Sequence, residues 1–482
     1  MNKIYNIPIT LSIILFLMIS CLPGSEHTGI KPNVIILLTD QWRAQDIGYM
    51  GNRQLFTPNI DKLERESVNI VNAVSGTPVC SPYRASLLTG QYPLTHGVFY
   101  NDKPLRNQAY TMGEIFSDAG YATAYIGKWH LNGRTENMTV NESRVLPVPK
   151  ERRQGFEFWR VHECTHDYRN SYYYDEQNEK HFWNGYDAFA QADLATDYIS
   201  DHSSKDKPFL LLLSVGPPHA PYQTAPDKFR KMYEKIEQLS LRENVPAQFD
   251  SIARVRLAGY YAHITALDEV VEVLQISIAE NGIEDNTIFI FTSDHGDMLY
   301  SHGFQKKQQP FDESIRVPFL IKYPAALNPY SRKLELPLNS PDILPTLLGL
   351  CDIEIPETVE GYDYATDLTS HTNVIDNPAL ISCQVPFHQW NYGRGGREYR
   401  GLRSNRYTYV EDLNGPWLLF DNVNDPYQLN NLVGDASVRS LQIEYHDLLL
   451  QKLKQRNDNF QIGDYYMTKW GYTYDGMDSL RN

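Results

Sequence analysis

Four short groups of polar residues each stand directly after an apolar run of the sequence, and all four carry side chains that can do chemistry. The first and fourth groups carry aspartates, the second a lysine and a histidine, and the third a histidine. Because the carboxyl ends of parallel strands meet at one edge of a sheet, we expect the four groups to converge there. Taken singly, each residue is explained as well by helix capping, turn packing or solvation. The groups are residues 39–41, 127–130, 217–219 and 293–297.

The residue types in these groups fit a bound cation surrounded by positive charge. Asp40 and Asp294, together with Gln41 or His295, offer the oxygen and imidazole ligands that an ion of the calcium or magnesium type takes. No pair of cysteines in the sequence frames a zinc site. A cluster of cations and proton donors beside such an ion would destabilise the folded protein through repulsion, but it would stabilise a bound tetrahedral oxyanion. That cluster is predicted to contain Arg84, Lys128, His130 and His219.

A further reactive side chain, Cys80, stands at the predicted start of a helix. Pro82 lies where the first helical turn begins, and an apolar rhythm follows it. Free N–H groups and the helix dipole stabilise an anion at a helix N-terminus. The sequence therefore predicts that negative charge at position 80 is favoured.

The segment 79–90, Val-Cys-Ser-Pro-Tyr-Arg-Ala-Ser-Leu-Leu-Thr-Gly, resembles the signature of the type I sulfatases, a family of the alkaline phosphatase superfamily. In that family the cysteine of Cys-x-Pro-x-Arg is oxidised after translation to Cα-formylglycine. The resemblance runs from Asn33 to about Leu432, and it includes Gly-Lys-Trp-His, Pro-His-Ala-Pro and Ser-Asp-His-Gly in the polar groups above. Tyr83 stands where the signature often has serine, which leaves open which maturation enzyme acts on the chain.

The resemblance implies a sulfuric ester hydrolase that uses one bound Ca2+ ion and a formylglycine made from Cys80. Gln41 stands where many relatives have a second aspartate, so the resemblance supports metal coordination by Gln41 less directly than by Asp40. The metal ligands that the resemblance implies are Asp40, Gln41, Cys80, Asp294 and His295.

The resemblance also implies roles for the cations and proton donors. Arg84 and Lys128 would hold the nucleophile, His219 and Lys307 would assist the departing alcohol oxygen, and His130 would help to expel sulfate. The register from Ser-His-Gly at 301–303 favours Lys307 over Lys306. The implied catalytic residues are Cys80, Arg84, Lys128, His130, His219 and Lys307.

The predicted substrate is a sulfated carbohydrate, from a polysaccharide such as algal ulvan or a glycosaminoglycan, because exported bacterial sulfatases most often act on glycans. The alternatives are a phosphonate or phosphate ester hydrolase of the same superfamily, and an unmatured, inactive glycan-binding lipoprotein. Aromatic and basic side chains suit sugar stacking and pairing with anions, although ordinary packing explains them equally well. The candidate substrate-binding residues are His162, His166, Trp390, Arg394 and Arg397.

Apolar, β-branched runs alternate with helical segments, which predicts an α/β fold with a large, mostly parallel central sheet flanked by helices on both faces. The predicted strands are 33–38, 121–126, 208–215, 287–291 and 317–321, and 251–280 is a predicted helix. Past about residue 370, the runs 398–409 and 417–420 predict a smaller C-terminal α+β subdomain built on an antiparallel sheet. The predicted organisation is a signal peptide with lipobox at 1–21, a linker at 22–31, a catalytic domain at 32–370 and the subdomain at 371–482.

The N-terminal segment predicts export. Lys3 precedes an apolar run too short to span a bilayer, and Met-Ile-Ser-Cys at 18–21 resembles a bacterial lipobox with Met18 in place of the usual leucine. We expect a lipid on Cys21 to anchor the protein in the periplasm or at the outer membrane, with ordinary signal cleavage as the alternative. The lipid would be the only contact with the membrane.

Net charge and cysteine content limit the other partners. The net charge of -15 argues against nucleic acid as a partner, and an anionic substrate therefore needs a local positive site. The partners we expect are a sulfated carbohydrate and a formylglycine-generating or equivalent maturation enzyme. Three of the five cysteines remain besides Cys21 and Cys80, which allows at most one disulfide.

Overall fold

The computed structural model describes residues 31–135, 137–327, 331–370 and 376–474. The predicted signal peptide, the lipobox cysteine Cys21 and the linker up to residue 30 lie outside the described residues. Lys31–Asn482 form one compact unit. None of the helices in the described ranges is long and apolar enough to cross a membrane. Within the same ranges Cys80, Cys164, Cys351 and Cys383 are buried and form no disulfide.

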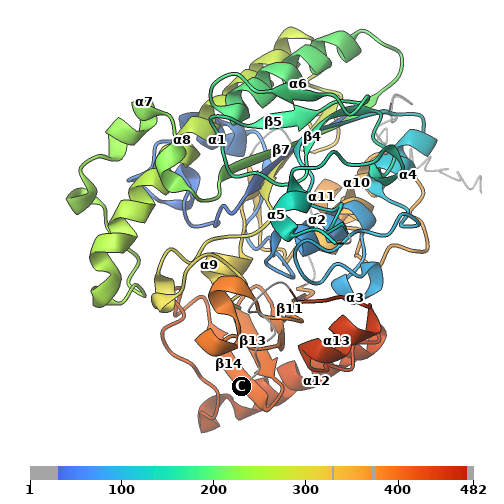
Figure 1. Cartoon of the computed structure of the whole chain (residues 1–482). Coiled ribbons are helices and arrows are strands. Elements are labelled where there is room, and N and C mark those ends of the chain that lie inside the picture. Colours follow the sequence, from blue (N-terminus) through green and yellow to red (C-terminus); the bar gives the residue numbers. More distant parts are fainter. Residues whose placement is uncertain (1–30, 136, 328–330, 371–375, 475–482) are drawn as a thin grey trace, which may run out of the picture. The chain divides into compact units, whose positions relative to one another are not determined.

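A ten-stranded sheet runs through the centre of this unit (Figure 1). In spatial order its strands are β10 (Arg332–Leu334), β2 (Val68–Ile70), β9 (Phe319–Lys322), β8 (Thr287–Ser293), β1 (Asn33–Asp40), β7 (Phe209–Pro218), β3 (Ala122–Lys128), β4 (Phe158–His162), β5 (Tyr172–Tyr174) and β6 (Lys180–Phe182). The five strands from β8 to β4 are parallel. All four strands that precede the polar groups belong to this parallel set, so the groups meet at one edge, as predicted.

The predicted strand 317–321 differs from the others, because β9 runs antiparallel to β8, with Ile290 opposite Ile321. A parallel strand needs a crossover, usually a helix of a dozen residues or more. The connection from β8 to β9 contains only the one-turn helix α9 (Asp312–Ile315) and a 3-10 turn, η7 (Ser301–Gly303). The chain therefore re-enters the sheet from the edge at which it left.

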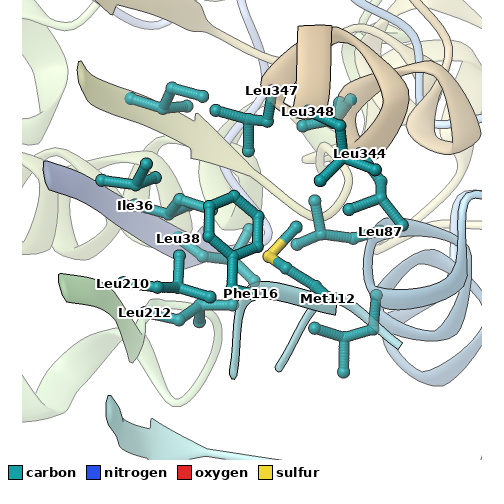
Figure 2. Packing of buried hydrophobic residues seen from close by; sticks show 14 of the residues in the cluster. Ile36, Leu38, Leu87, Met112, Phe116, Leu210, Leu212, Leu344, Leu347 and Leu348 are labelled. Carbon is teal, nitrogen blue, oxygen red and sulfur yellow. The ribbon is translucent and has the colours of Figure 1, made fainter. Parts of the chain in front are cut away.

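Helices cover both faces of the sheet because the central strands carry apolar side chains on both faces. Val34, Ile36 and Leu38 of β1 belong to one hydrophobic cluster, and Ile35 and Leu37 belong to the other. Figure 2 shows the first cluster, in which side chains of α2, α4 and α10 lie against those of β1 and β7. The helices on this face are α2 (Cys80–Thr89), α4 (Met112–Asp118) and α10 (Ile343–Leu350), and those on the other are α1 (Pro58–Arg65), α6 (Asp187–Ser203) and α8 (Asp250–Glu280).

A second, four-stranded antiparallel sheet follows towards the C-terminus, which confirms the predicted antiparallel sheet there. The runs 398–409 and 417–420 correspond to its last three strands, whereas its first strand and two C-terminal helices were not predicted. A hydrogen bond of 2.9 Å between Thr77 Oγ1 and Ser382 Oγ ties this sheet to the loop before α2. The elements are β11 (Ala379–Cys383), β12 (Tyr399–Arg403), β13 (Tyr407–Asp412), β14 (Gly415–Asp421), α12 (Arg439–Gln455) and α13 (Gly463–Lys469).

Five shorter elements complete the α-helices of the described residues. They are α3 (Pro93–His96), α5 (Val140–Arg144), α7 (Asp227–Arg230), α9 and α11 (Ala365–Thr369). Of these, α5 carries Arg144, which lines the cavity described below, and α9 packs Ile315 into a third hydrophobic cluster.

The substitution Phe116→Ala should destabilise the protein. Phe116 is fully buried between α10 and the strands β1 and β7, and removing a ring from such a place costs about 3–5 kcal/mol in the free energy of unfolding. The measurement is the midpoint of thermal unfolding followed by circular dichroism. The control is Phe182→Ala on the edge strand β6, where the side chain is 68% exposed and the cost stays within about 0.5 kcal/mol. Equal midpoints for the two variants would contradict this packing.

Candidate active site

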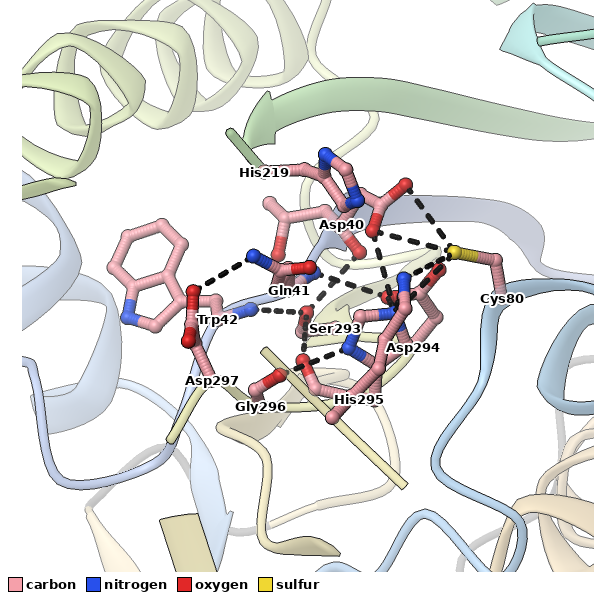
Figure 3. Close-up of polar contacts among 12 residues, drawn as sticks. Asp40, Gln41, Trp42, Cys80, His219, Ser293, Asp294, His295, Gly296 and Asp297 are labelled. Atoms are coloured by element: carbon pink, nitrogen blue, oxygen red, sulfur yellow. Dashed lines mark hydrogen bonds and ion pairs between the residues drawn. The ribbon is translucent and has the colours of Figure 1, made fainter. Parts of the chain in front are cut away.

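Cys80 is the first residue of α2, and its side chain lies buried among charged groups at the sheet edge (Figure 3). The sulfur lies 2.8 Å from Lys307 Nζ, 3.3 Å from His295 Nε2 and 3.7 Å from Asp40 Oδ1. Burial and Asp40 raise the pKa of the thiol, but Lys128, Lys307 and His295 outweigh them. The pKa of Cys80 therefore lies well below its usual value, which agrees with the prediction that negative charge is favoured at this position.

Two carboxylates face Cys80 from the ends of adjacent parallel strands. β1 ends at Asp40, and Asp294 directly follows β8. His295 Nε2 lies 3.4 Å from Asp40 Oδ1 and 3.3 Å from Asp294 Oδ1. Ligand atoms of these three residues and Cys80 all lie within 4.8 Å of one another, and all four residues are buried. Buried carboxylates beside an imidazole form a donor set that suits a divalent cation.

The two carboxylates differ in their electrostatic surroundings. Burial and the charge of Asp40 raise the pKa of Asp294 above its usual value. Burial also acts to raise the pKa of Asp40, but Lys128 and the nearby imidazoles and Lys307 outweigh it, and that pKa falls well below its usual value. The pair thus retains negative charge at the position where a cation would bind.

Gln41 adds a further candidate ligand, and Asp297 determines its orientation. Its Nε2 donates hydrogen bonds to Asp297 Oδ2 at 2.7 Å and to Tyr222 Oη at 3.2 Å. An ionised carboxylate only accepts hydrogen bonds, so the amide nitrogen must face Asp297 and the amide oxygen must face away. That oxygen is buried and has no hydrogen-bond partner in the part of the chain that the structure describes. Figure 3 shows it turned towards Asp40 and Asp294, which fits a ligand of the same cation.

Arg84 and Lys128 hold positive charge against the two carboxylates. Arg84 stands four residues after Cys80 on α2, so the two side chains leave the same face of the helix. Its guanidinium lies 3.1 Å from Asp294 Oδ2, and Lys128 Nζ, at the end of β3, lies 2.5 Å from Asp40 Oδ2. Burial acts to lower both pKa values, but the carboxylates outweigh it and raise the pKa of Arg84 and of Lys128. Both side chains are therefore cations.

His130 is held by a carboxylate that the sequence analysis missed. Its Nε2 lies 3.1 Å from Asp102 Oδ1, and Arg144 Nε and Nη2 lie 2.7 and 2.6 Å from the two oxygens of Asp102. Burial acts to lower the pKa of His130, but Cys164 and Asp102 raise it well above its usual value. Asp102 stands in a loop at φ 57° and follows no strand, so a search of strand ends cannot find it. Asp102 and Arg144 are positioning residues for His130.

His219 and Lys307 lie on the side of Cys80 that faces a cavity. His219 Nδ1 lies 2.7 Å from the carbonyl oxygen of Ala220, which only accepts, so Nδ1 carries a proton. The ring of His166 stacks on it, with centroids 4.2 Å apart. Burial and His166 hold the pKa of His219 well below its usual value. The lysine next to Cys80 is Lys307, the position that the motif register favours.

The cavity has a volume of about 1010 Å³, which is larger than one sulfate group needs and suits a ligand of sugar size. Cys80 is among its lining residues, and exposed side chains such as Ile252 and Glu234 line its outer part. Its charged and imidazole lining residues are His130, Arg144, His166, His219, Arg230, Glu234, Arg256, Lys306, Lys307 and His388.

The structure brings one of the five predicted substrate-binding residues, His166, to the cavity wall. His162 is buried opposite Lys128 in the β3–β4 pair, and neither of its ring nitrogens has a hydrogen-bond partner among the described residues. Burial and the neighbouring cations lower its pKa to about 3. His162 is therefore a neutral residue of the interior and is not among the lining residues.

The Gly-rich loop of the C-terminal subdomain reaches the cavity through Phe387, His388 and Gln389, and not through the predicted residues. Trp390 packs in a hydrophobic cluster with Tyr399 because burying a large indole is more favourable than exposing it. The other two predicted residues also lie outside the lining. Arg394 is exposed, and Arg397 pairs with Asp412 at 2.8 Å and stacks on Trp417.

Comparison with known proteins agrees with this geometry. The profile of the Sulfatase family matches residues 32–353, and the profile "N-sulphoglucosamine sulphohydrolase, C-terminal" matches residues 300–456. The chain is 44% identical over 447 residues to an ulvan-active sulfatase of Formosa agariphila, a match that covers 92% of this chain and 85% of that protein. It is 31% identical over 472 residues to an endo-4-O-sulfatase of Bacteroides thetaiotaomicron, with 88% and 91% covered.

A solved structure gives the same result for the fold. The proposed sulfatase YidJ of Bacteroides fragilis superimposes with a TM-score of 0.82 at 30% identity, over 90% of this chain and 98% of that one. The matched Sulfatase profile contains Cys80 and every strand-end group described above. The chain therefore belongs to the type I sulfatase family of the alkaline phosphatase superfamily and is a sulfuric ester hydrolase.

Proposed function

We propose that this enzyme removes sulfate from polysaccharide fragments by means of a formylglycine made from Cys80 and one bound Ca2+ ion. The observation that carries the proposal is the position of Cys80, at the start of a buried helix, within 4 Å of Asp40, His295 and Lys307. The cavity beside it accommodates a sugar, and the relatives named above are sulfatases that act on ulvan or at a 4-O position.

The donor set fits the proposed ion. Asp40, Gln41, Asp294 and His295 would hold it together with the modified residue 80, and a set rich in oxygen donors favours Ca2+ or Mg2+ over zinc. A bound ion would lower the pKa of the nucleophile and withdraw charge from the sulfate oxygens.

A formylglycine hydrate would supply one hydroxyl to attack sulfur and a second to expel sulfate afterwards, whereas a thiolate has no second hydroxyl. The side chains of this enzyme then carry the charge and the protons. Arg84 and Lys128 stabilise the negative charge of the nucleophile and of the sulfate oxygens. Asp294, whose pKa is raised, accepts the proton of the attacking hydroxyl.

The remaining proton transfers fall to the cavity side of the site. A bound sulfate brings negative charge next to His219 and favours its protonated form, so that His219 and Lys307 can donate to the departing alcohol oxygen. His130 is oriented by Asp102 through Nε2, and in its neutral form it would accept the proton of the second hydroxyl at Nδ1, which has no hydrogen-bond partner among the described residues. A sugar hydroxyl is a poor leaving group, so the donation by His219 and Lys307 matters most for glycan substrates.

Two rival functions are separated by simple comparisons. A phosphonate or phosphate ester hydrolase would prefer the phosphate ester over the sulfate ester of the same alcohol. An inactive binding protein would retain an unmodified thiol, which mass analysis of the peptide containing Cys80 detects in protein from its native host. Activity towards aryl sulfates alone, in a screen that includes sulfated oligosaccharides, would rule out the glycan substrate.

The substitution Cys80→Ala should lower kcat for a sulfate ester more than about a thousandfold, because no other residue supplies the nucleophile. Fold and metal binding should persist, since the other four proposed ligands, Asp40, Gln41, Asp294 and His295, stay in place; the thermal midpoint checks the fold, and a calorimetric titration of Ca2+ checks the binding. The matched control is Cys351→Ala, a buried cysteine at the end of α10 on the core side, which should keep kcat. Near wild-type turnover by Cys80→Ala would disprove the mechanism.

The substitution Asp297→Asn should weaken Ca2+ binding although it removes no proposed ligand. An asparagine can donate as well as accept, so it no longer forces the oxygen of Gln41 towards the ion. The loss of such a supporting contact costs about 10–100-fold in metal affinity. The measurement is a calorimetric titration of Ca2+ into chelator-treated protein, with Asp412→Asn on the C-terminal sheet as the control. Unchanged affinity in Asp297→Asn would refute the role of Asp297, and preference for Mg2+ would refute the choice of ion.

We also propose that the enzyme is an exported lipoprotein anchored through Cys21, on the basis of the pattern in residues 1–21. The full-length chain, expressed in a Gram-negative host, should fractionate with membranes and yield a lipidated N-terminal peptide that begins at Cys21. Cys21→Ala should release the enzyme into a soluble fraction. Recovery of the unaltered chain as soluble protein with an unmodified Cys21 would argue for ordinary signal cleavage instead.

A further inference from the structure

The cavity above Cys80 contains two cationic side chains that the mechanism does not use and that have no ion-pair partner among the described residues. Arg256 of α8 and Lys306, which precedes Lys307, both line it. Within the described ranges neither side chain forms an ion pair or a side-chain hydrogen bond. Both are part-buried, so they lie in the wall of the cavity and not on an open surface.

The two other arginines that line the cavity, Arg144 and Arg230, already form ion pairs with carboxylates. Arg144 pairs with Asp102 at 2.6 Å, and Arg230 pairs with Asp227 at 3.2 Å. Glu234 is the only carboxylate among the lining residues that the structure describes, and it is exposed. Among the described lining residues, therefore, no carboxylate pairs with Arg256 or Lys306.

Both residues are in contact with the network that orients Gln41. The guanidinium of Arg256 lies 5.9 Å from the ring centroid of Tyr222, whose hydroxyl donates to Asp297. The backbone N–H of Lys306 donates to the other oxygen of Asp297 at 3.1 Å. The network thus fixes the backbone of Lys306 and lies beside the guanidinium of Arg256.

The two charges also act on each other. Burial lowers the pKa of Lys306 first, and Lys307 and Arg256 lower it further, while Asp297 and Cys80 act in the opposite direction. Repulsion between neighbouring cations is relieved when an anion binds between them. The chain as a whole is negatively charged, with a net charge of -15, so two unpaired cations in one cavity are a local exception.

We propose that Arg256 and Lys306 form a second anion subsite, which binds a carboxylate or a second sulfate on the saccharide whose scissile sulfate lies at position 80. The inference rests on the proposed function and names the substrate class more closely: a sugar unit or disaccharide with at least two negative charges. The planar guanidinium of Arg256 matches the two oxygens of a carboxylate or a sulfate, and Lys306 adds a point charge.

The test compares substrates that differ in the second anion. They are 4-nitrophenyl sulfate, a glucuronic acid-containing disaccharide monosulfate, the same disaccharide with its carboxyl group reduced to an alcohol, and a disulfate of the reduced disaccharide. The variants are Arg256→Ala and Lys306→Ala. The matched control is Arg254→Ala, on the same helix, whose side chain pairs with Asp250 and does not line the cavity.

Each variant should lose at least about tenfold more kcat/KM on a doubly charged disaccharide than on 4-nitrophenyl sulfate, mainly through KM, because one charge-assisted hydrogen bond is worth that factor. Arg254→Ala should show no such difference. A loss confined to the glucuronic acid-containing substrate identifies the ligand as a carboxylate, and a loss confined to the disulfate identifies it as a second sulfate. On the reduced disaccharide monosulfate, which lacks the second anion, the variants should have nearly the same kcat/KM as the wild type.

Binding to Cys80→Ala protein, measured by calorimetry, provides a readout that does not depend on turnover. There Arg256→Ala should weaken the affinity for the doubly charged disaccharide by the same factor. Equal losses on all substrates, or no loss of affinity on any disaccharide, would overturn the subsite. Failure of the matured wild-type enzyme to hydrolyse any sulfated saccharide would instead overturn the proposed function, while the affinities would still decide the subsite.

Discussion

The pairing of two buried carboxylates, Asp40 and Asp294, is the interaction on which the rest of the site depends. Like charges placed in the interior cost free energy unless cations and hydrogen bonds compensate them. Here Arg84 and Lys128 lie against them, His295 lies between them, and the donor set suits a divalent ion. The adjacency of β1 and β8 creates this arrangement, because it places the two strand ends next to each other.

Two further carboxylates near the site, Asp297 and Asp102, act mainly by fixing the orientation of neighbouring side chains. Asp297 and Asp102 are carboxylates that can only accept hydrogen bonds, so each determines which atom of its neighbour faces the reaction centre. Asp297 turns the amide oxygen of Gln41 towards Asp40 and Asp294, and Asp102, held by Arg144, orients the ring of His130. The same Asp297 anchors Tyr222 and the backbone of Lys306, so the buried carboxylate cluster and the cavity wall share one support.

The C-terminal sheet contributes to the site from outside the main sheet. β11 ties down the loop that precedes α2, and the segment after it supplies His388 and Gln389 to the cavity. Substrate recognition therefore draws on both sheets, whereas the chemistry draws on the strand ends of the main sheet and on α2. This division is expected of a family in which the reaction is shared and the substrates differ.

The sequence by itself determined the fold class, the central parallel strands, the long helix α8 and the residues at the reaction centre. These follow from local patterns, since apolar runs mark buried strands and the polar residues after them must meet at one edge. Only the tertiary structure decided the direction of β9, the supporting roles of Asp102 and Asp297, and the use of His388 in place of Trp390. Each depends on contacts between segments far apart in the chain, such as Gln41 with Asp297, which no local periodicity encodes. The role of Arg256 also depends on the tertiary structure, because the sequence does not show whether an arginine on a helix faces solvent or a cavity.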